Sequence, residues 1–297
     1  MAVTPQLEEL IRLLKAAGGE PRATIEEARA SYELRMSSLE LDADVTTERV
    51  GAGGVPAEWV STPGTARDRV MLYLHGGYYA IGSMRTHRVY LSRLSRATGA
   101  RLLGLDYRLA PENPFPAALQ DTLAAYRWLI SNGIEPKKIA IGGESAGGGL
   151  TAAACVALRY MGDPLPGAAV CISSWADLAH TGESITSNAA VDPTVTLERG
   201  AEMARLYLAG RDPKTPLASP VYADLGGLPP MLIMAGSVEI LRDDSVRLAQ
   251  RAQEAGVEAT LEIWDDMPHN WPMYAHMLPE AQRAVDRIGE FVQGHLG

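Results

Sequence analysis

One short run of residues limits what this chain can fold into more than any other. Residues 139–149 read Ile-Ala-Ile-Gly-Gly-Glu-Ser-Ala-Gly-Gly-Gly, so an apolar, β-branched stretch leads into a serine among small residues. Gly143, Ser145 and Gly147 fill the pattern Gly-x-Ser-x-Gly. A strand that turns sharply into a helix leaves no room for side chains beside the turn, so the glycines let the backbone close and hold the serine hydroxyl outward. The run therefore predicts a strand, a strained serine at the tip of a turn, and a helix.

The five-residue pattern alone does not separate a nucleophilic serine from an ordinary turn. The strand expected over 137–141 and the helix expected over 146–160 supply the setting that favours a nucleophile. A phosphate-binding loop is disfavoured, because no Lys-Ser or Lys-Thr pair follows the glycines and no G-x-G-x-x-G pattern is present here.

A second glycine-containing loop lies upstream, where the strand expected over 70–74 ends in His-Gly-Gly-Tyr-Tyr at 75–79. Paired glycines let the main chain approach a ligand with its N–H groups exposed. His75 is interpreted as a brace of this loop rather than as a catalytic base. We expect an oxyanion hole formed by amides of this loop and of the first helical residue after the serine: Gly76, Gly77, Tyr78 and Ala146.

A nucleophilic serine needs a base, and the base needs an acid that orients it. In this architecture the chain order is Ser, then acid, then His. His269 is the preferred base, because it lies in a loop after the apolar strand expected over 259–264, and loops at strand ends carry chemistry. His180, also in a loop, is the second choice, while surface positions account for His276 and His295.

The acid is predicted to be Glu239, in the loop after the strand expected over 230–236 and thirty residues before His269. Asp243 is the runner-up. Asp243 and Asp244 fit better as cap and first-turn acids of the helix that runs through 246–255, where they favour the positive end of its dipole.

Together these motifs resemble the bacterial branch of the hormone-sensitive-lipase family of α/β-hydrolase carboxylesterases. The resemblance covers nearly the whole chain. It is carried by Tyr73-Leu74-His75-Gly76-Gly77-Tyr78-Tyr79-Ala80-Ile81-Gly82-Ser83, Asp106-Tyr107-Arg108-Leu109-Ala110-Pro111-Glu112, Pro114-Phe115-Pro116-Ala117-Ala118, Glu144-Ser145-Ala146-Gly147, Ser219-Pro220, Leu228-Pro229-Pro230 and the loops around Glu239 and His269. It implies hydrolysis of short-chain acyl esters through an acyl-serine, without cofactor or metal, by a core domain under a helical cap. Members of the family often form homodimers.

The chain departs from the family pattern at two positions. Tyr78 stands where the family has a third glycine; its N–H can still donate, but its phenol narrows the substrate pocket, which we expect Tyr78 and Tyr79 to line. Glu239 stands where the family more often has Asp, so the loop must absorb one extra methylene.

Strand and helix patterns alternate along the chain, which predicts an α/β fold with an eight-stranded, mostly parallel sheet and helices on both faces. The expected strands cover 45–50, 58–61, 70–74, 101–106, 137–141, 168–172, 231–234 and 259–263. The expected core helices cover 86–98, 116–131, 146–160, 244–255 and 279–293. Segments 1–44 (helices at 6–17 and 25–39) and 183–217 are predicted to form the cap, with Asp192-Pro193 as a helix start, and 45–182 and 218–297 to form the catalytic core.

Composition excludes several classes of protein. A net charge of −9 over 297 residues argues against nucleic acid as a partner. No apolar run reaches the roughly 18 residues of a membrane span, so we expect a cytoplasmic protein that binds a small-molecule ester and no membrane. Cys155 and Cys171 are interpreted as small core residues.

Three other functions are weighed against ester hydrolysis on these residues. Lactone ring opening uses the same three side chains. A ligand-binding protein on the same scaffold, as in the plant gibberellin receptor, lacks the histidine, so the presence of His269 argues against it. An amidase is weaker, because nothing specific suggests protonation of a poor amine leaving group.

Overall fold

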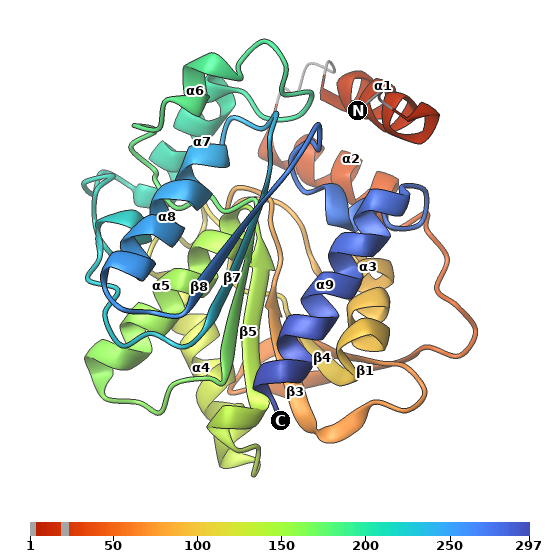
Figure 1. The fold of residues 1–297 in the computed structure, drawn as a ribbon, viewed down its shortest axis with the longest axis vertical. Helices are drawn as coiled ribbons and strands as arrows, with labels where there is room; N and C mark the ends of the chain where they lie inside the picture. Colours follow the sequence, from red (N-terminus) through yellow and green to blue (C-terminus); the bar gives the residue numbers. More distant parts are fainter. Residues whose placement is uncertain (1–3, 19–23) are drawn as a thin grey trace.

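A single sheet forms the centre of the molecule in the computed structural model, which describes residues 4–18 and 24–297 (Figure 1). Its strand order is β1-β2-β4-β3-β5-β6-β7-β8. The β1–β2 and β2–β4 pairs are antiparallel, and the other pairs are parallel, as predicted. The strands are β1 Thr46–Ala52, β2 Val55–Ser61, β3 Ala66–Leu74, β4 Ala100–Leu105, β5 Ile139–Glu144, β6 Ala168–Ile172, β7 Met231–Gly236 and β8 Ala259–Trp264.

Helices cover both faces of the sheet, which explains why the central strands are buried along their whole length. On one face lie α3 (Met84–Thr98) and α9 (Pro279–His295), and on the other α4 (Ala117–Ser131), α5 (Ala146–Met161) and α8 (Arg242–Glu254) (Figure 1). The glycine at 289 lets α9 approach α3 closely, because a Cβ there would lie 2.4 Å from the Ala97 carbonyl oxygen.

Four further helices gather at one end of the molecule, beyond the sheet (Figure 1). They are α1 (Pro5–Gly18), α2 (Ile25–Met36), α6 (Ser184–Ser187) and α7 (Leu197–Leu208). These helices come from the two segments predicted to form the cap. The division into core and cap segments stays a prediction.

Local boundaries differ from the sequence expectations in several places; β2 and β3, for example, begin at Val55 and Ala66 instead of at 58 and 70. The strand expected from 137 begins at Ile139, because Pro136–Lys138 form a 3-10 turn, and it extends to Glu144 through pairing with β6. Helix α2 ends at Met36 rather than 39. Asp192-Pro193 does not start a helix; Thr196 caps α7 by accepting the Arg199 amide.

Two other sequence predictions concern the helices and the cysteines. Within the residues described, no helix combines the length and the apolar character that crossing a bilayer requires. Both cysteines are buried free thiols, as expected. Burial raises the pKa of Cys155 to about 12, so this thiol is protonated at neutral pH.

Candidate active site

The serine turn is fixed by close contacts between β5, α5 and the end of β3. Ser145 has φ 55°, a left-handed value that few residues other than glycine adopt. A Cβ at Gly143 would lie 2.4 Å from the Leu74 carbonyl oxygen, and one at Gly147 would lie 1.9 Å from the same atom. Both positions therefore exclude any side chain, and the serine is held at the tip by a 2.9 Å bond from its N–H to the Ile172 carbonyl.

Three side chains predicted from the sequence lie in one hydrogen-bonded line. The Ser145 hydroxyl Oγ is 3.0 Å from His269 Nε2, and His269 Nδ1 is 2.6 Å from Glu239 Oε2. The strands β5, β7 and β8 bring them together, because each side chain follows the carboxyl end of one of these parallel strands. All three side chains are buried.

The environment of His269 favours its protonated form. Burial opposes the charge, but the hydrogen bond to Glu239 and the negative charge of that carboxylate outweigh burial, so the pKa of His269 is raised above its usual value. With Nδ1–H donating to Glu239, the neutral tautomer presents an Nε2 lone pair to the serine hydroxyl. This arrangement can remove a proton from Ser145.

The Gly76 amide does not belong to an oxyanion hole, and that prediction is wrong. Its N–H donates to the carboxylate of Glu144, which lies between the glycine and the serine of the turn. A Cβ at Gly76 would lie 2.7 Å from Glu144 Oε1, so this glycine is required for the contact. The Gly76 amide joins the two loops instead of facing the site.

The next two residues turn the backbone into the site. Gly77 has φ 113°, and a Cβ there would lie 2.2 Å from the Ile81 carbonyl oxygen, so only glycine fits. Tyr78 follows with φ 58°, a position that would suit the third glycine of the family pattern. Ala146 is the first residue of α5, where an amide has no acceptor within its own helix. These amides remain the candidate oxyanion donors.

Glu144 is a buried ionised group that sequence reasoning missed. Its carboxylate also accepts from the Tyr73 hydroxyl and lies 2.8 Å from His87 Nε2. Burial alone would raise the pKa of Glu144, but the nearby His87 charge and the hydrogen bonds together lower it; the same pairing raises the pKa of His87 against its burial. A charged residue inside a run of small and apolar residues was the available signal.

The loop that carries Glu239 is held by residues with no sequence signal. Ser173 Oγ donates to Glu239 Oε1 at 2.9 Å and accepts from the Asn270 N–H at 3.1 Å. The Asn188 side chain donates to the carbonyls of Ser237 and Glu239, both at 2.9 Å.

Asp192 makes a further contact from the same segment, accepting the Ile240 N–H at 2.8 Å. Residues after α6, inside the segment predicted to form the cap, are thus bonded directly to this loop.

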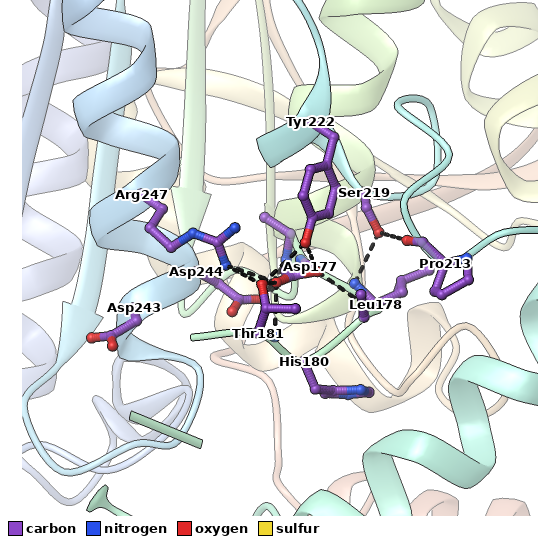
Figure 2. Close-up of polar contacts among 12 residues, drawn as sticks. Asp177, Leu178, His180, Thr181, Pro213, Ser219, Tyr222, Asp243, Asp244 and Arg247 are labelled. Carbon is purple, nitrogen blue, oxygen red and sulfur yellow. Dashed lines mark hydrogen bonds and ion pairs between the residues drawn. The ribbon is translucent and has the colours of Figure 1, made fainter. Parts of the chain in front are cut away.

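The other candidate acids have different partners. Asp243 accepts from Arg242 and from the Ser184 amide. Asp244 is in the first turn of α8, as predicted, but it is buried and accepts the amides of Ala176 and Asp177. Figure 2 shows it beside Asp177. Neither carboxylate has a recorded contact with His269.

The other histidines are likewise engaged or remote. His75 braces its loop as expected: its Nδ1 is 2.7 Å from the Gly76 carbonyl, and its ring stacks on Tyr107. Burial lowers the pKa of His75 to about 4, so its ring is neutral. His180 Nε2 accepts from Trp175 Nε1 at 3.3 Å. His276 is exposed, and His295 bonds the Phe291 carbonyl within α9.

A cavity of about 120 Å³ opens onto Ser145 and His269. Residues of the N-terminal helices and of three loops close it, among them Leu14, Tyr32, Arg35, Tyr78, Val195 and Tyr274. Tyr78 lines it as predicted. Tyr79 does not, and that prediction is wrong, because its ring is buried and stacks at 3.7 Å on Tyr207 of α7.

Comparison with known proteins agrees with this geometry. Residues 71–273 match the family of proteins with the alpha/beta hydrolase fold. An acetyl-hydrolase of Streptomyces hygroscopicus is 44% identical over 294 residues, which cover 99% of this chain and 98% of that protein. The crystal structure of an esterase from the bacterial hormone-sensitive-lipase family is 56% identical with a TM-score of 0.98, and the match covers 100% of both chains.

A crystal structure of the esterase EstE5, soaked with p-nitrophenyl butyrate, is 43% identical with a TM-score of 0.95 and 99% of each chain covered. Fold and matches together define a carboxylic ester hydrolase. This chain belongs to the bacterial hormone-sensitive-lipase family of α/β hydrolases.

Proposed function

We propose that the protein is a serine carboxylesterase that hydrolyses short-chain acyl esters through an acyl-serine intermediate. The observation that carries the proposal is the hydrogen-bonded line from Ser145 through His269 to Glu239. A serine is a weak nucleophile until a base removes its proton, and this geometry supplies the base and orients it.

The first half of the reaction forms the acyl-enzyme. Ser145 Oγ attacks the ester carbonyl while His269 Nε2 takes its proton, and Glu239 stabilises the imidazolium that results. The carbonyl oxygen becomes negative and is bound by the amides of Gly77, Tyr78 and Ala146. His269 then gives the proton to the alcohol oxygen as the carbon–oxygen bond breaks.

The second half repeats these steps with water. His269 removes a proton from water, the resulting hydroxide attacks the acyl carbonyl, and the bond to Ser145 Oγ breaks as the serine recovers its proton. The acid is released, and the site returns to its starting protonation.

The small cavity supports short acyl chains. The cavity that opens onto Ser145 and His269 measures only about 120 Å³. The EstE5 structure was soaked with a butyrate ester, a short-chain compound, and that protein is 43% identical to this chain.

A chain-length series with 4-nitrophenyl esters tests the proposal. We expect kcat/KM to be highest for acetate to butyrate and to fall steeply for longer chains. Ser145→Ala and His269→Ala should each lower kcat by about 10⁶, the loss seen when such a nucleophile or base is removed. A lactone and an anilide belong in the same series: a higher kcat/KM on the lactone than on every ester would make the protein a lactonase.

Intact mass measurement tests the intermediate. After rapid acid quench during turnover, the wild-type protein should be heavier by the mass of one acyl group, and Ser145→Ala should show no added mass. Full ester turnover by Ser145→Ala, or acylation at another residue, would contradict the proposal.

A further inference from the structure

We propose that the pocket prefers esters that carry a second, negatively charged group, and that Arg35 of α2 binds this group. The inference rests on the proposed function, because it assigns a substrate class to the same site: short esters with a carboxylate a few carbons from the ester bond.

Arg35 lines the cavity that contains Ser145 and His269. It lies in the last turn of α2, and its guanidinium carbon is 5.4 Å from the centre of the Tyr32 ring. Other arginines nearby are paired, such as Arg29 with Glu112 and Arg85 with Glu33. In the part of the chain that the structure describes, Arg35 makes no ion pair.

The permanent charge on the wall of the cavity is positive. Among the described residues, no Asp or Glu lines it, and Arg35 is its one permanently charged side chain. The neighbouring carboxylate on α2, Glu33, accepts from the Ser83 hydroxyl and faces Arg85 instead. In a chain of net charge −9, this pocket is therefore locally favourable for an anion.

Two phenols complete the candidate anion site. Tyr32 and Tyr274 line the same cavity, and neither hydroxyl is hydrogen-bonded to another of the described residues. Burial raises the pKa of both, so both remain protonated donors, and the charge of Arg35 acts on each of them. A guanidinium and two hydroxyl donors match the acceptor oxygens of a carboxylate.

A basic residue in a last helical turn also stabilises the helix through its dipole, so stability alone does not test the proposal. The proposal is tested by comparing kcat/KM for two substrates that have the same shape but differ in charge. Monoethyl glutarate and its amide, ethyl glutaramate, place the charge on the acyl side. Acetoxyacetate and acetoxyacetamide place it on the alcohol side.

We expect the ratio of kcat/KM for the acid to kcat/KM for its amide to be about 3- to 10-fold lower in Arg35→Gln than in the wild type for at least one pair. The change should come mainly from KM. That range corresponds to a partly exposed charge interaction of roughly 1 kcal/mol. Arg35→Lys should retain part of the ratio. In 0.5 M NaCl the wild-type ratio should fall toward that of Arg35→Gln, because salt screens exposed charges.

Arg12→Gln is the matched control, because it removes the same charge from α1 outside the cavity. It should leave both ratios at the wild-type value. Thermal unfolding of each variant shows that the fold is kept.

Equal ratios in wild type and Arg35→Gln would overturn the inference. Hydrolysis of 4-nitrophenyl acetate without hydrolysis of either acid would also overturn it while leaving the esterase proposal intact. Failure on every ester, by contrast, would remove the proposed function and the inference with it.

Discussion

At the scale of single residues, Glu239 and His269 form a buried pair, and in the proposed mechanism its charge state sets the pH range of activity. His269 must be neutral to accept the serine proton, and Glu239 raises its pKa. We therefore expect activity to be lost as the pH falls through a pKa that lies above the usual value for histidine.

Removing the charge of Glu239 tests this assignment. In Glu239→Gln we expect kcat to fall by about 10²–10⁴ and the acid limb of the kcat/KM profile to move to lower pH, because the imidazolium loses its counter-charge. Rates between pH 5 and 9 measure both effects. Asp243→Asn is the control and should retain most of the rate; a loss as deep as that of Glu239→Gln would make Asp243 the acid.

Tyr78 is the second residue with a direct test, because it occupies a left-handed position and lines the cavity. Tyr78→Gly should relieve about 1 kcal/mol of backbone strain and open the pocket, so kcat/KM for tert-butyl acetate should rise several-fold relative to ethyl acetate. Tyr79→Phe is the matched control, since that ring stacks on Tyr207 outside the cavity. An unchanged ratio in Tyr78→Gly would show that the phenol does not narrow the site.

At the scale of elements, the segment after α6 holds the loop that carries Glu239. Asn188 and Asp192 bind three backbone groups of residues 237–240. This segment therefore helps to position Glu239, and its Thr194 and Val195 line the cavity.

The effect of these bonds is measurable in kcat. Asn188→Ala should lower kcat by about 10- to 100-fold with little change in KM, because a small displacement of Glu239 is costly and Asn188 does not line the cavity. The pH profile of Asn188→Ala should shift as well, since the Glu239–His269 distance changes. Thr186→Ala, an exposed change in α6 two residues before Asn188, is the control. A variant with changed stability but wild-type kcat and pH profile would limit Asn188 to a structural role.

At the scale of the whole molecule, a buried pair of His87 and Glu144 joins α3 to the centre of the sheet. His87 and Glu144 are 0% and 1% exposed, with the Tyr73 hydroxyl and the Gly76 amide on the same carboxylate. Because the pKa of His87 is raised on folding, the pair stabilises the folded protein fully at pH values below about 6.5, the pKa of histidine in the unfolded chain. This stabilisation is lost as the pH rises through the pKa of His87 in the folded protein. The lowered pKa of Glu144 adds stability above about 4.3, and this is lost as the pH falls.

The two effects overlap between roughly pH 4.5 and 6.5. His87→Gln keeps a hydrogen-bond donor but no charge, so its free energy of unfolding should be lower than that of the wild type by on the order of 2 kcal/mol in this range. The difference should shrink at higher pH. Urea unfolding from pH 4 to 9 measures it, with the exposed His276→Gln as control. A difference that does not change with pH would mean that the pair is uncharged.

The sequence by itself determined the features that depend on local backbone geometry. Only glycine fits at three positions, because a Cβ there would collide with the backbone: Gly77, Gly143 and Gly147. The alternation of strands and helices likewise fixed the parallel sheet, and the strand ends fixed where Ser145, Glu239 and His269 meet.

Only the tertiary structure decided which partner each polar group takes. The Gly76 amide donates to Glu144, Tyr79 stacks on Tyr207 of α7 instead of entering the pocket, and Ser173 and Asn188 hold the loop that carries Glu239. These partners are separated by up to 128 residues, as in the contact of Tyr79 with Tyr207. Hydrogen bonding and packing depend on distance in space, and short sequence patterns record only neighbours along the chain.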